Sequence, residues 1–128
     1  MTFDERSNKD ANPGYWQEMF GRYDTDKNKQ LFLVCESGDA IVGFIIGEIR
    51  DWEFGSEPCG WVFALGVRPD IRLSGIATQL YGALCEFFKQ AGVTTVRTML
   101  ARQDIDSLSF FRSQGMMAGP YVQLEKDI

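Results

Sequence analysis

Residues 60–92 decide the fold of this chain, and they are Gly-Trp-Val-Phe-Ala-Leu-Gly-Val-Arg-Pro-Asp-Ile-Arg-Leu-Ser-Gly-Ile-Ala-Thr-Gln-Leu-Tyr-Gly-Ala-Leu-Cys-Glu-Phe-Phe-Lys-Gln-Ala-Gly. Residues 61–67 form an apolar run rich in β-branched and aromatic side chains, which is typical of a buried strand. Beyond residue 75, apolar side chains recur at helical spacing until Gly92, and they are Ile76, Leu80, Leu84, Phe87 and Ala91. The sequence therefore predicts a strand, a glycine-bearing turn and a helix.

The turn at residues 72–77 is the first candidate for a binding site. A tight turn between a strand and a helix directs unpaired backbone N–H groups and the positive end of the helix dipole at one spot. Such a spot binds anions, and phosphate in particular. A simpler interpretation is that Gly75 only allows the chain to turn before an ordinary core helix.

Length and composition indicate one globular domain over residues 1–128, in which residues 1–11 form a loose, charged lead. The chain has no apolar run of about eighteen residues and its N-terminus is too polar for a signal peptide, so a cytoplasmic location is the default and no membrane partner is expected. The net charge of -5 argues against nucleic-acid binding and suits an amine substrate.

Cysteine and histidine usage excludes several kinds of site. Cys35, Cys59 and Cys85 are odd in number and far apart, so we interpret them as free thiols. The chain has no histidine, which excludes Ser-His and Cys-His catalytic units and any His-ligated metal. We therefore expect no metal site.

Hydrophobic patterning predicts the remaining elements, and together they give an α/β class with one curved, mixed sheet. A helix is predicted at residues 13–22, after the N-cap and proline pair Asn12-Pro13. Strands are predicted at residues 30–36, 40–51, 93–100 and 120–124, the first two joined by a hairpin turn at 37–39. Residues 51–59 form a loop. Asp104 can cap a short helix that ends at Gly115.

The run Val67-Arg68-Pro69 followed by Arg72-x-x-Gly75-x-Ala77 resembles motif A of the GNAT superfamily of acyl-CoA N-acyltransferases. In that motif an Arg/Gln-x-x-Gly-x-Gly/Ala loop wraps the pyrophosphate of coenzyme A. The element order also resembles the GNAT fold over residues 30–128, but the usual first strand and first helix have no clear counterpart before Pro13. The resemblance thus implies a GNAT-like fold lacking those two elements, and pairing in a homodimer would cover the edge strand that this leaves.

The resemblance implies acetyl-CoA as the cosubstrate and assigns residues to it. In such proteins the strand before motif A bends away from its parallel neighbour, and pantetheine lies between them. The backbone of Leu65 and Val67 would therefore bind pantetheine. The amides that would bind the pyrophosphate belong to Arg72, Leu73, Ser74, Gly75, Ile76, Ala77 and Thr78. Leu73 and Ser74 replace the motif's usual glycine and basic residue, but backbone amides do most of this work.

A second resemblance lies in Asp104-x-x-Ser107-x-x-Phe110-Phe111-x-x-x-Gly115-Met116. The family segment is Asn-x-x-Ala-x-x-Phe-Tyr-x-x-x-Gly-Phe, in which the Asn contacts pantetheine and the Tyr protonates the leaving thiolate. Asp104 and Phe111 occupy these two positions. A phenyl ring has no proton to give, and Phe110 and Phe111 can equally be core residues.

A catalytic base in a chain without histidine would be a carboxylate or a chain of waters. Glu48, Glu53 and Glu57 could face the thioester end of the cleft, and Glu48 and Glu57 are our candidates. Acidic side chains are more often solvated surface charges, which is the competing interpretation for each. Cys59 and Tyr121 are weaker candidates for a proton donor.

Two functions are compatible with these residues. The first is an N-acetyltransferase that transfers an acetyl or acyl group from acetyl-CoA to a primary amine, in a small molecule or a peptide, by direct transfer in a ternary complex. The alternative is a non-catalytic acyl-CoA-binding sensor or interaction module, and Phe111 favours it because the acid is missing there.

Overall fold

The computed structural model describes residues 29–70 and 75–128. In chain order the elements are β1 Gln30–Ser37, β2 Ala40–Arg50, the 3-10 turn η1 Glu53–Gly55, β3 Cys59–Val67, α2 Ile76–Gln90, β4 Val96–Thr98 and α3 Ile105–Ser113. The helix expected at residues 13–22, and the question of a missing first strand and first helix, lie outside the described residues. Arg72, Leu73 and Ser74 lie outside them as well.

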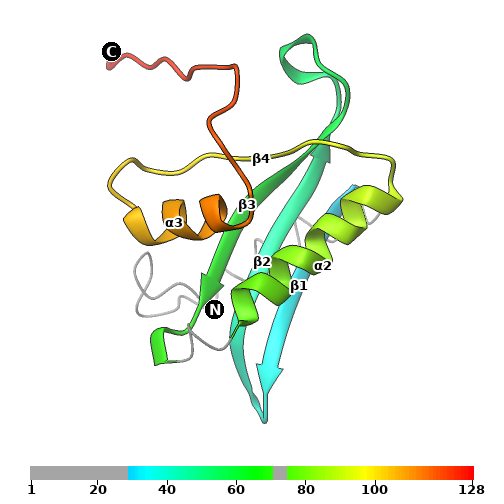
Figure 1. Ribbon diagram of the computed structural model, residues 1–128, viewed down its shortest axis with the longest axis vertical. Helices are drawn as coiled ribbons and strands as arrows, with labels where there is room; N and C mark the ends of the chain where they lie inside the picture. The colour runs from blue at the N-terminus through cyan, green and yellow to red at the C-terminus, as the bar shows by residue number, and fades with distance from the viewer. Residues whose placement is uncertain (1–28, 71–74) are drawn as a thin grey trace.

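The strands form one sheet in the order β1-β2-β3-β4. The β1–β2 and β2–β3 pairs are antiparallel and the β3–β4 pair is parallel. Helix α2 lies along one face of β1, β2 and β3, while α3 lies on the β4 side of β3 (Figure 1). The mixed α/β class predicted from the sequence is confirmed.

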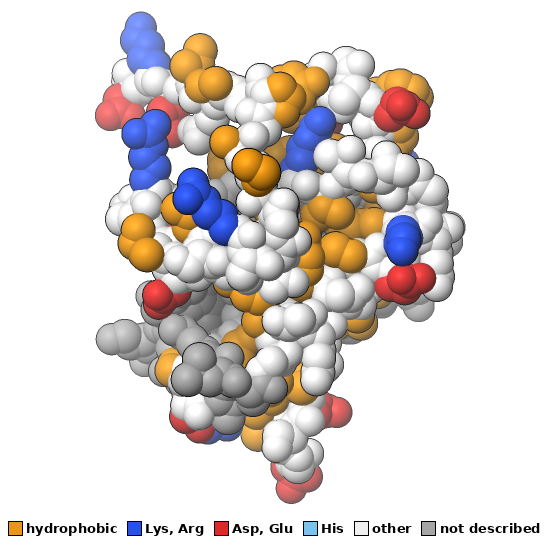
Figure 2. Space-filling view, in the orientation of Figure 1, with side chains coloured by type: hydrophobic (Ala, Val, Ile, Leu, Met, Phe, Trp, Pro, Cys, Tyr) orange, Lys and Arg blue, Asp and Glu red, His pale blue; other side chains and the backbone are white. Residues whose placement is uncertain are grey.

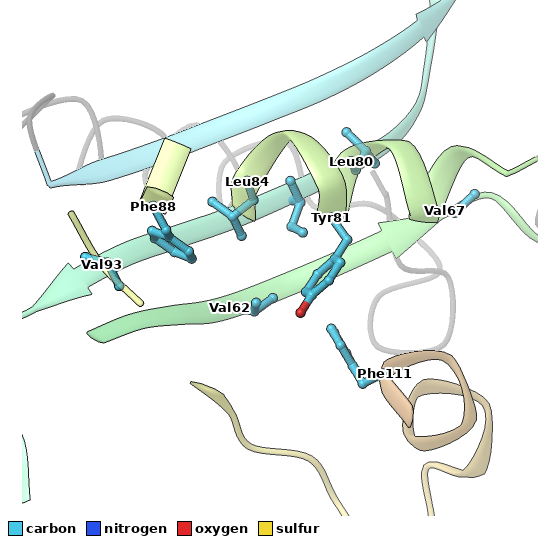
Figure 3. Close-up of a cluster of buried hydrophobic side chains, with 9 residues drawn as sticks. Val62, Val67, Leu80, Tyr81, Leu84, Phe88, Val93 and Phe111 are labelled. Carbon is cyan, nitrogen blue, oxygen red and sulfur yellow. The ribbon is translucent and has the colours of Figure 1, made fainter. Parts of the chain in front are cut away.

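The core lies between α2 and the sheet, and glycines in two strands allow the helix to approach closely. A Cβ atom added to Gly60 would lie 2.5 Å from the ring of Phe88, and one added to Gly47 would lie 2.6 Å from Leu84. Figure 3 shows Phe88 and Leu84 pointing from α2 onto β2 and β3. Both side chains are fully buried, so the glycines create the space that the two most deeply buried side chains of the helix occupy.

The hairpin, the central strand and helix, and the helix after Asp104 are confirmed with small changes in their bounds. The strand expected at residues 93–100 is limited to Val96–Thr98. The strand expected at residues 120–124 is wrong, because this segment pairs with no strand of the described sheet. Its Tyr121 instead stacks on Phe54 of η1, with ring centroids 4.8 Å apart. Strand propensity alone does not form a strand without a ladder partner.

No helix in the described parts of the chain combines the length and the apolar character that crossing a membrane requires.

Candidate functional site

Strands β3 and β4 separate part-way along β3. The parallel ladder joins residues Gly60–Val62 to Val96–Thr98, whereas β3 continues to Val67. At the end of the ladder the side chain of Thr98 donates a hydrogen bond from Oγ1 to the carbonyl oxygen of Val62, at 3.0 Å. The second half of β3 is therefore not paired with β4, and we call this unpaired side of β3, where the two strands separate, the opening.

A β-bulge at Phe63 reverses which backbone groups face this opening. In the register of β2 with β3, Ile46 is opposite Ala64 and Gly47 is opposite Val62, so Phe63 is the extra residue. Before the bulge, even-numbered residues of β3 face β4. After it, the alternation is reversed, so the backbone N–H and C=O groups of the odd-numbered residues point away from β2 and towards the β4 side.

Two hydrogen bonds establish this reversal. Before the bulge, Gly60 N–H donates to Thr95 O on the β4 side, at 2.9 Å. After it, Arg68 N–H donates to Val42 O on the β2 side, also at 2.9 Å. The backbone groups of Leu65 and Val67 are therefore on the side of β3 that faces the opening, which is the side where the family resemblance implies a pantetheine arm.

Helix α2 begins next to the end of β3, and Gly75 occupies its N-cap position. Gly75 has φ 87°, in the left-handed region, and a Cβ atom added to it would meet no atom of the described residues within 4 Å. Among the described residues no steric contact requires glycine here, so its backbone conformation is the reason for it. The first turn carries no acidic residue. The N–H groups of Ile76, Ala77 and Thr78 thus begin a helix whose N-terminus is suited to an anion.

Asp104 and Phe111 are both used by the structure of α3. Asp104 caps the helix, since its Oδ1 accepts a hydrogen bond from Ser107 N at 3.2 Å. Phe111 is 4% exposed and packs against Tyr81 of α2 (Figure 3). The burial of Tyr81 itself, with the Cys85 thiol as a smaller cause, raises the pKa of its phenol well above the ordinary range. Phe111 is therefore a core residue in this structure.

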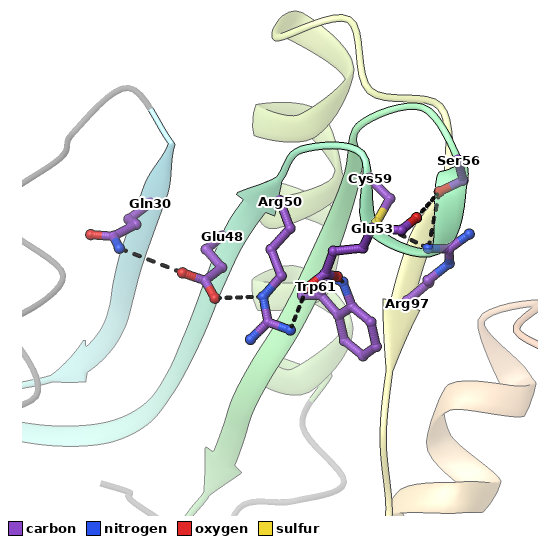
Figure 4. Close-up of polar contacts among 8 residues, drawn as sticks. All are labelled: Gln30, Glu48, Arg50, Glu53, Ser56, Cys59, Trp61 and Arg97. Carbon is purple, nitrogen blue, oxygen red and sulfur yellow. Dashed lines mark hydrogen bonds and ion pairs between the residues drawn. The ribbon is translucent and has the colours of Figure 1, made fainter. Parts of the chain in front are cut away.

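The carboxylates of Glu48 and Glu53 belong to one polar network at the start of β3 (Figure 4). Glu48 Oε1 accepts a 2.8 Å hydrogen bond from Arg50 Nε. Glu53 accepts at Oε1 from Trp61 Nε1, at 2.8 Å, and at Oε2 from Arg50 Nη1, at 3.5 Å. Glu57 is exposed and lies in the loop before β3. Across the described ranges, acidic and cysteine side chains do not gather in threes as a metal ion would need.

Arg97 of β4 is a functional candidate that the sequence did not reveal. Its Cζ lies 5.7 Å from the centroid of the Phe54 ring and 5.1 Å from that of Tyr121. Its Nη1 donates to Ser56 Oγ at 3.4 Å and to Cys59 Sγ at 3.3 Å. Each of these partners is more than twenty residues away in the sequence, so no local pattern could show the cluster. Arg97 is also the register partner of Trp61.

The turn that carries Phe54 has an unusual backbone. Trp52 and Phe54 have φ values of 58° and 56°, in the left-handed region that bulky residues rarely adopt. Both side chains are largely exposed, at 65% and 58%. Such conformations cost about 1–3 kcal/mol each and are concentrated at functional sites.

The model of the acetyltransferase (GNAT) family matches residues 3–116. The chain belongs to this family. The motif at residues 67–77 and the helix from Ile105 are thus parts of a GNAT domain, as the sequence predicted. No curated protein matches this GNAT chain.

Solved structures share the GNAT fold. Aminoglycoside 6'-N-acetyltransferase AAC(6')-IG from Acinetobacter haemolyticus is 27% identical, with a TM-score of 0.75, and the match covers 93% of this chain and 83% of that one. AAC(6')-Iy in complex with a CoA bisubstrate analogue is 16% identical, with a TM-score of 0.80 over 97% and 86%. A soil metagenomic enzyme, meta-AAC0020 in complex with sisomicin, is 21% identical, with a TM-score of 0.70 over 87% and 72%.

Proposed function

We propose that this GNAT chain transfers the acetyl group of acetyl-CoA to a primary amine by direct transfer in a ternary complex. The observation that carries the proposal is the opening between β3 and β4, towards which the bulge at Phe63 turns the backbone of Leu65. An extended pantetheine arm can hydrogen-bond there as an additional strand does. The complex of AAC(6')-Iy with a CoA bisubstrate analogue supports this choice of ligand.

Acetyl-CoA would then lie along β3, with its pyrophosphate at the N-terminus of α2. Its pyrophosphate would bind at residues 72–78, where Gly75, Ile76, Ala77 and Thr78 begin the helix. Its pantetheine would follow Val67 and Leu65 and pass Asp104 and Phe111 on the α3 side. Its thioester would reach the point where Val62 and Thr98 end the ladder.

The reaction proposed is nucleophilic attack of the neutral amine nitrogen on the thioester carbonyl carbon. A backbone N–H of the second half of β3 stabilises the oxyanion of the tetrahedral intermediate. The carbon–sulfur bond then breaks, an amide forms, and the thiolate of coenzyme A takes up a proton. The proton lost by the amine passes to a carboxylate, directly or through water, and Glu48 and Glu57 are the candidates.

One observation favours the alternative, a non-catalytic acyl-CoA-binding sensor. Phe111 stands where the family resemblance implies a tyrosine acid, and its ring is buried against Tyr81. A sensor needs the phosphate-binding turn and the β3 opening but no acid. Coenzyme A binding is therefore common to both functions, and only turnover separates them.

Two measurements test the proposal. Acetyl-CoA at millimolar concentration should raise the melting temperature, because a ligand that binds only the folded state stabilises it by mass action. A thiol-release assay with polyamines, amino acids, aminoglycosides and peptide N-termini should then identify an acceptor. Stabilisation without thiol release from any acceptor would favour the sensor, and no stabilisation would refute the acetyl-CoA site.

We further propose a cytoplasmic homodimer. The segment after α3 exposes the apolar side chains of Met117, Val122 and Leu124, which a second copy of the chain could cover. Light scattering on the purified protein tests this, and a double Val122→Asp, Leu124→Asp variant should then be monomeric. A monomeric unmodified protein would refute the dimer.

A further inference from the structure

Arg97 lies on β4 one residue before the point where the proposed thioester would lie, and its guanidinium extends towards Ser56 and Cys59 at the start of β3. It is opposite Trp61 in the parallel ladder, one residue before the pair of Val62 and Thr98 at which β3 and β4 separate. Side chains alternate between the two faces of a strand. Val62 belongs to the core under α2, so Trp61 and Arg97 project from the opposite face. A molecule bound on that face can reach the opening without crossing the core.

The Arg97 guanidinium carries a charge that no carboxylate neutralises within the described part of the chain. The ion pairs found there use Lys29, Arg50 and Arg68 as their cations. The polar partners of Arg97 are instead a hydroxyl and a thiol, Ser56 Oγ and Cys59 Sγ. A partly buried guanidinium has five N–H donors, and a neutral hydroxyl and a thiol leave much of its capacity for an anion unused.

Aromatic contacts hold this guanidinium in place. Phe54 and Tyr121 stack on each other, and both rings lie against Arg97. Tyr121 OH also donates to the backbone oxygen of Phe54, at 3.4 Å. The left-handed backbone at Phe54 places its ring at this position. A planar guanidinium fixed in this way loses little further entropy when it binds a carboxylate.

We propose that Arg97 binds the carboxylate of the acceptor, and that the acceptor is therefore an amino acid whose amine receives the acetyl group. This inference rests on the transferase activity proposed above and specifies its substrate class. A carboxylate matches the guanidinium fork in shape and charge, and it would direct the nearby amine towards the β3–β4 opening. An amine that carries only positive charge would face an unneutralised cation at this point, which disfavours polycationic acceptors such as sisomicin.

The experiment compares L-amino acids with their carboxamides as acceptors for the unmodified protein, by thiol release from acetyl-CoA. The carboxamide keeps the amine and the side chain and removes only the charge. Charge-assisted hydrogen bonds contribute about 1.5–3 kcal/mol, so kcat/KM should be about 10- to 100-fold higher for the acid. Sisomicin, included as a polycationic acceptor, should be the poorer substrate.

The variant Arg97→Gln should reduce this ratio to about one, mainly by raising KM for the acid, while the stabilisation by acetyl-CoA is unchanged. Arg112→Gln, at an exposed arginine of α3, is the matched control, since it removes the same charge and should keep the preference. If Arg97→Gln does not fold, the ratio of kcat/KM between amino acid and carboxamide in the unmodified protein still tests the carboxylate site.

Turnover of carboxamides or of sisomicin at rates equal to those of the acids would overturn the carboxylate site and leave the transferase intact. Stabilisation by acetyl-CoA without thiol release from any acceptor would overturn the transferase, and the inference with it.

Discussion

The rings of Tyr81 and Phe111 meet edge-on, with centroids 5.9 Å apart and 73° between their planes. This contact joins α2 to α3 and closes the core on the β4 side of β3 (Figure 3). It also puts a phenol and a phenyl ring side by side at the position where the family resemblance implies a catalytic phenol. A hydroxyl group added to Phe111 would therefore enter a packed environment.

The variant Phe111→Tyr should leave the rate of acetyl transfer unchanged or raise it. General acid catalysis contributes about 10²- to 10⁴-fold, so a well-aimed phenol would be visible in a thiol-release assay. If the new hydroxyl finds no partner, its burial should lower the free energy of unfolding by about 1–3 kcal/mol. Complete loss of turnover in a folded variant would show that the ring itself contacts the substrate, and would contradict the interpretation of Phe111 as a core residue.

The variant Gly75→Glu should abolish coenzyme A binding and leave the protein folded. A carboxylate at the N-terminus of α2 would repel the pyrophosphate, and the left-handed φ makes any side chain costly there. Gly92→Glu is the matched control, because Gly92 has φ 84° and lies at the other end of the same helix. Both variants should lose stability in urea, Gly92→Glu the more because its carboxylate lies at the negative end of the helix dipole, but only Gly75→Glu should lose affinity in calorimetry. Equal affinities would refute the phosphate site.

The variant Tyr81→Phe should make stability less sensitive to alkaline pH. Burial, with a smaller effect of Cys85, raises the pKa of Tyr81 above its ordinary value of 10.0. Above pH 10 the unfolded state therefore loses this proton while the folded state keeps it. The stabilisation is complete below pH 10 and falls by up to about 1.4 kcal/mol per pH unit above it.

Urea unfolding between pH 8 and pH 11 measures this dependence. The control is Tyr121→Phe, which removes a phenol from an exposed ring and should keep the decline of the unmodified protein. An identical decline in Tyr81→Phe and the unmodified protein would contradict the raised pKa.

The variant Gly60→Ala should destabilise the protein by about 1–3 kcal/mol, because the new methyl group would overlap the Phe88 ring. A second substitution, Phe88→Leu, should relieve part of this overlap. Gly82→Ala in α2 is the control, since a Cβ atom there meets no atom of the described residues within 4 Å. It should instead stabilise the helix by about 0.5–1 kcal/mol. Denaturant midpoints measure all three effects, and an unchanged midpoint in Gly60→Ala would show that the helix can move away at no cost.

The central strand, turn and helix could be predicted because their signals are local. The apolar run at residues 61–67, Gly75 and the helical spacing to Gly92 lie within one stretch, and α2 Ile76–Gln90 follows them closely. The capping of α3 by Asp104 is local as well. The same reasoning failed for residues 120–124, where strand propensity was present but no ladder partner exists among the described strands.

The polar part of the site could be predicted only in part, because it depends on contacts between distant residues. Glu48 and Glu53 were identified as single carboxylates, but the hydrogen bonds that join them to Arg50 and Trp61 follow from the pairing of β2 with β3. The environment of Arg97 requires the fold to bring Phe54 and Tyr121 together. Likewise, the bulge at Phe63 appears only when the register of the two strands is known.

The short ladder between β3 and β4 also determines where local unfolding of the molecule should begin. Strands β2 and β3 share eight register pairs, whereas β3 and β4 share three. Amide protons of β4 should therefore exchange with solvent through a local opening that leaves the hairpin and α2 intact, at a lower free energy than global unfolding. A ligand that hydrogen-bonds between the separated strands would add hydrogen bonds beyond the end of that ladder and stabilise β4. Slower amide exchange at Val96–Thr98 would therefore detect its binding even in the absence of turnover.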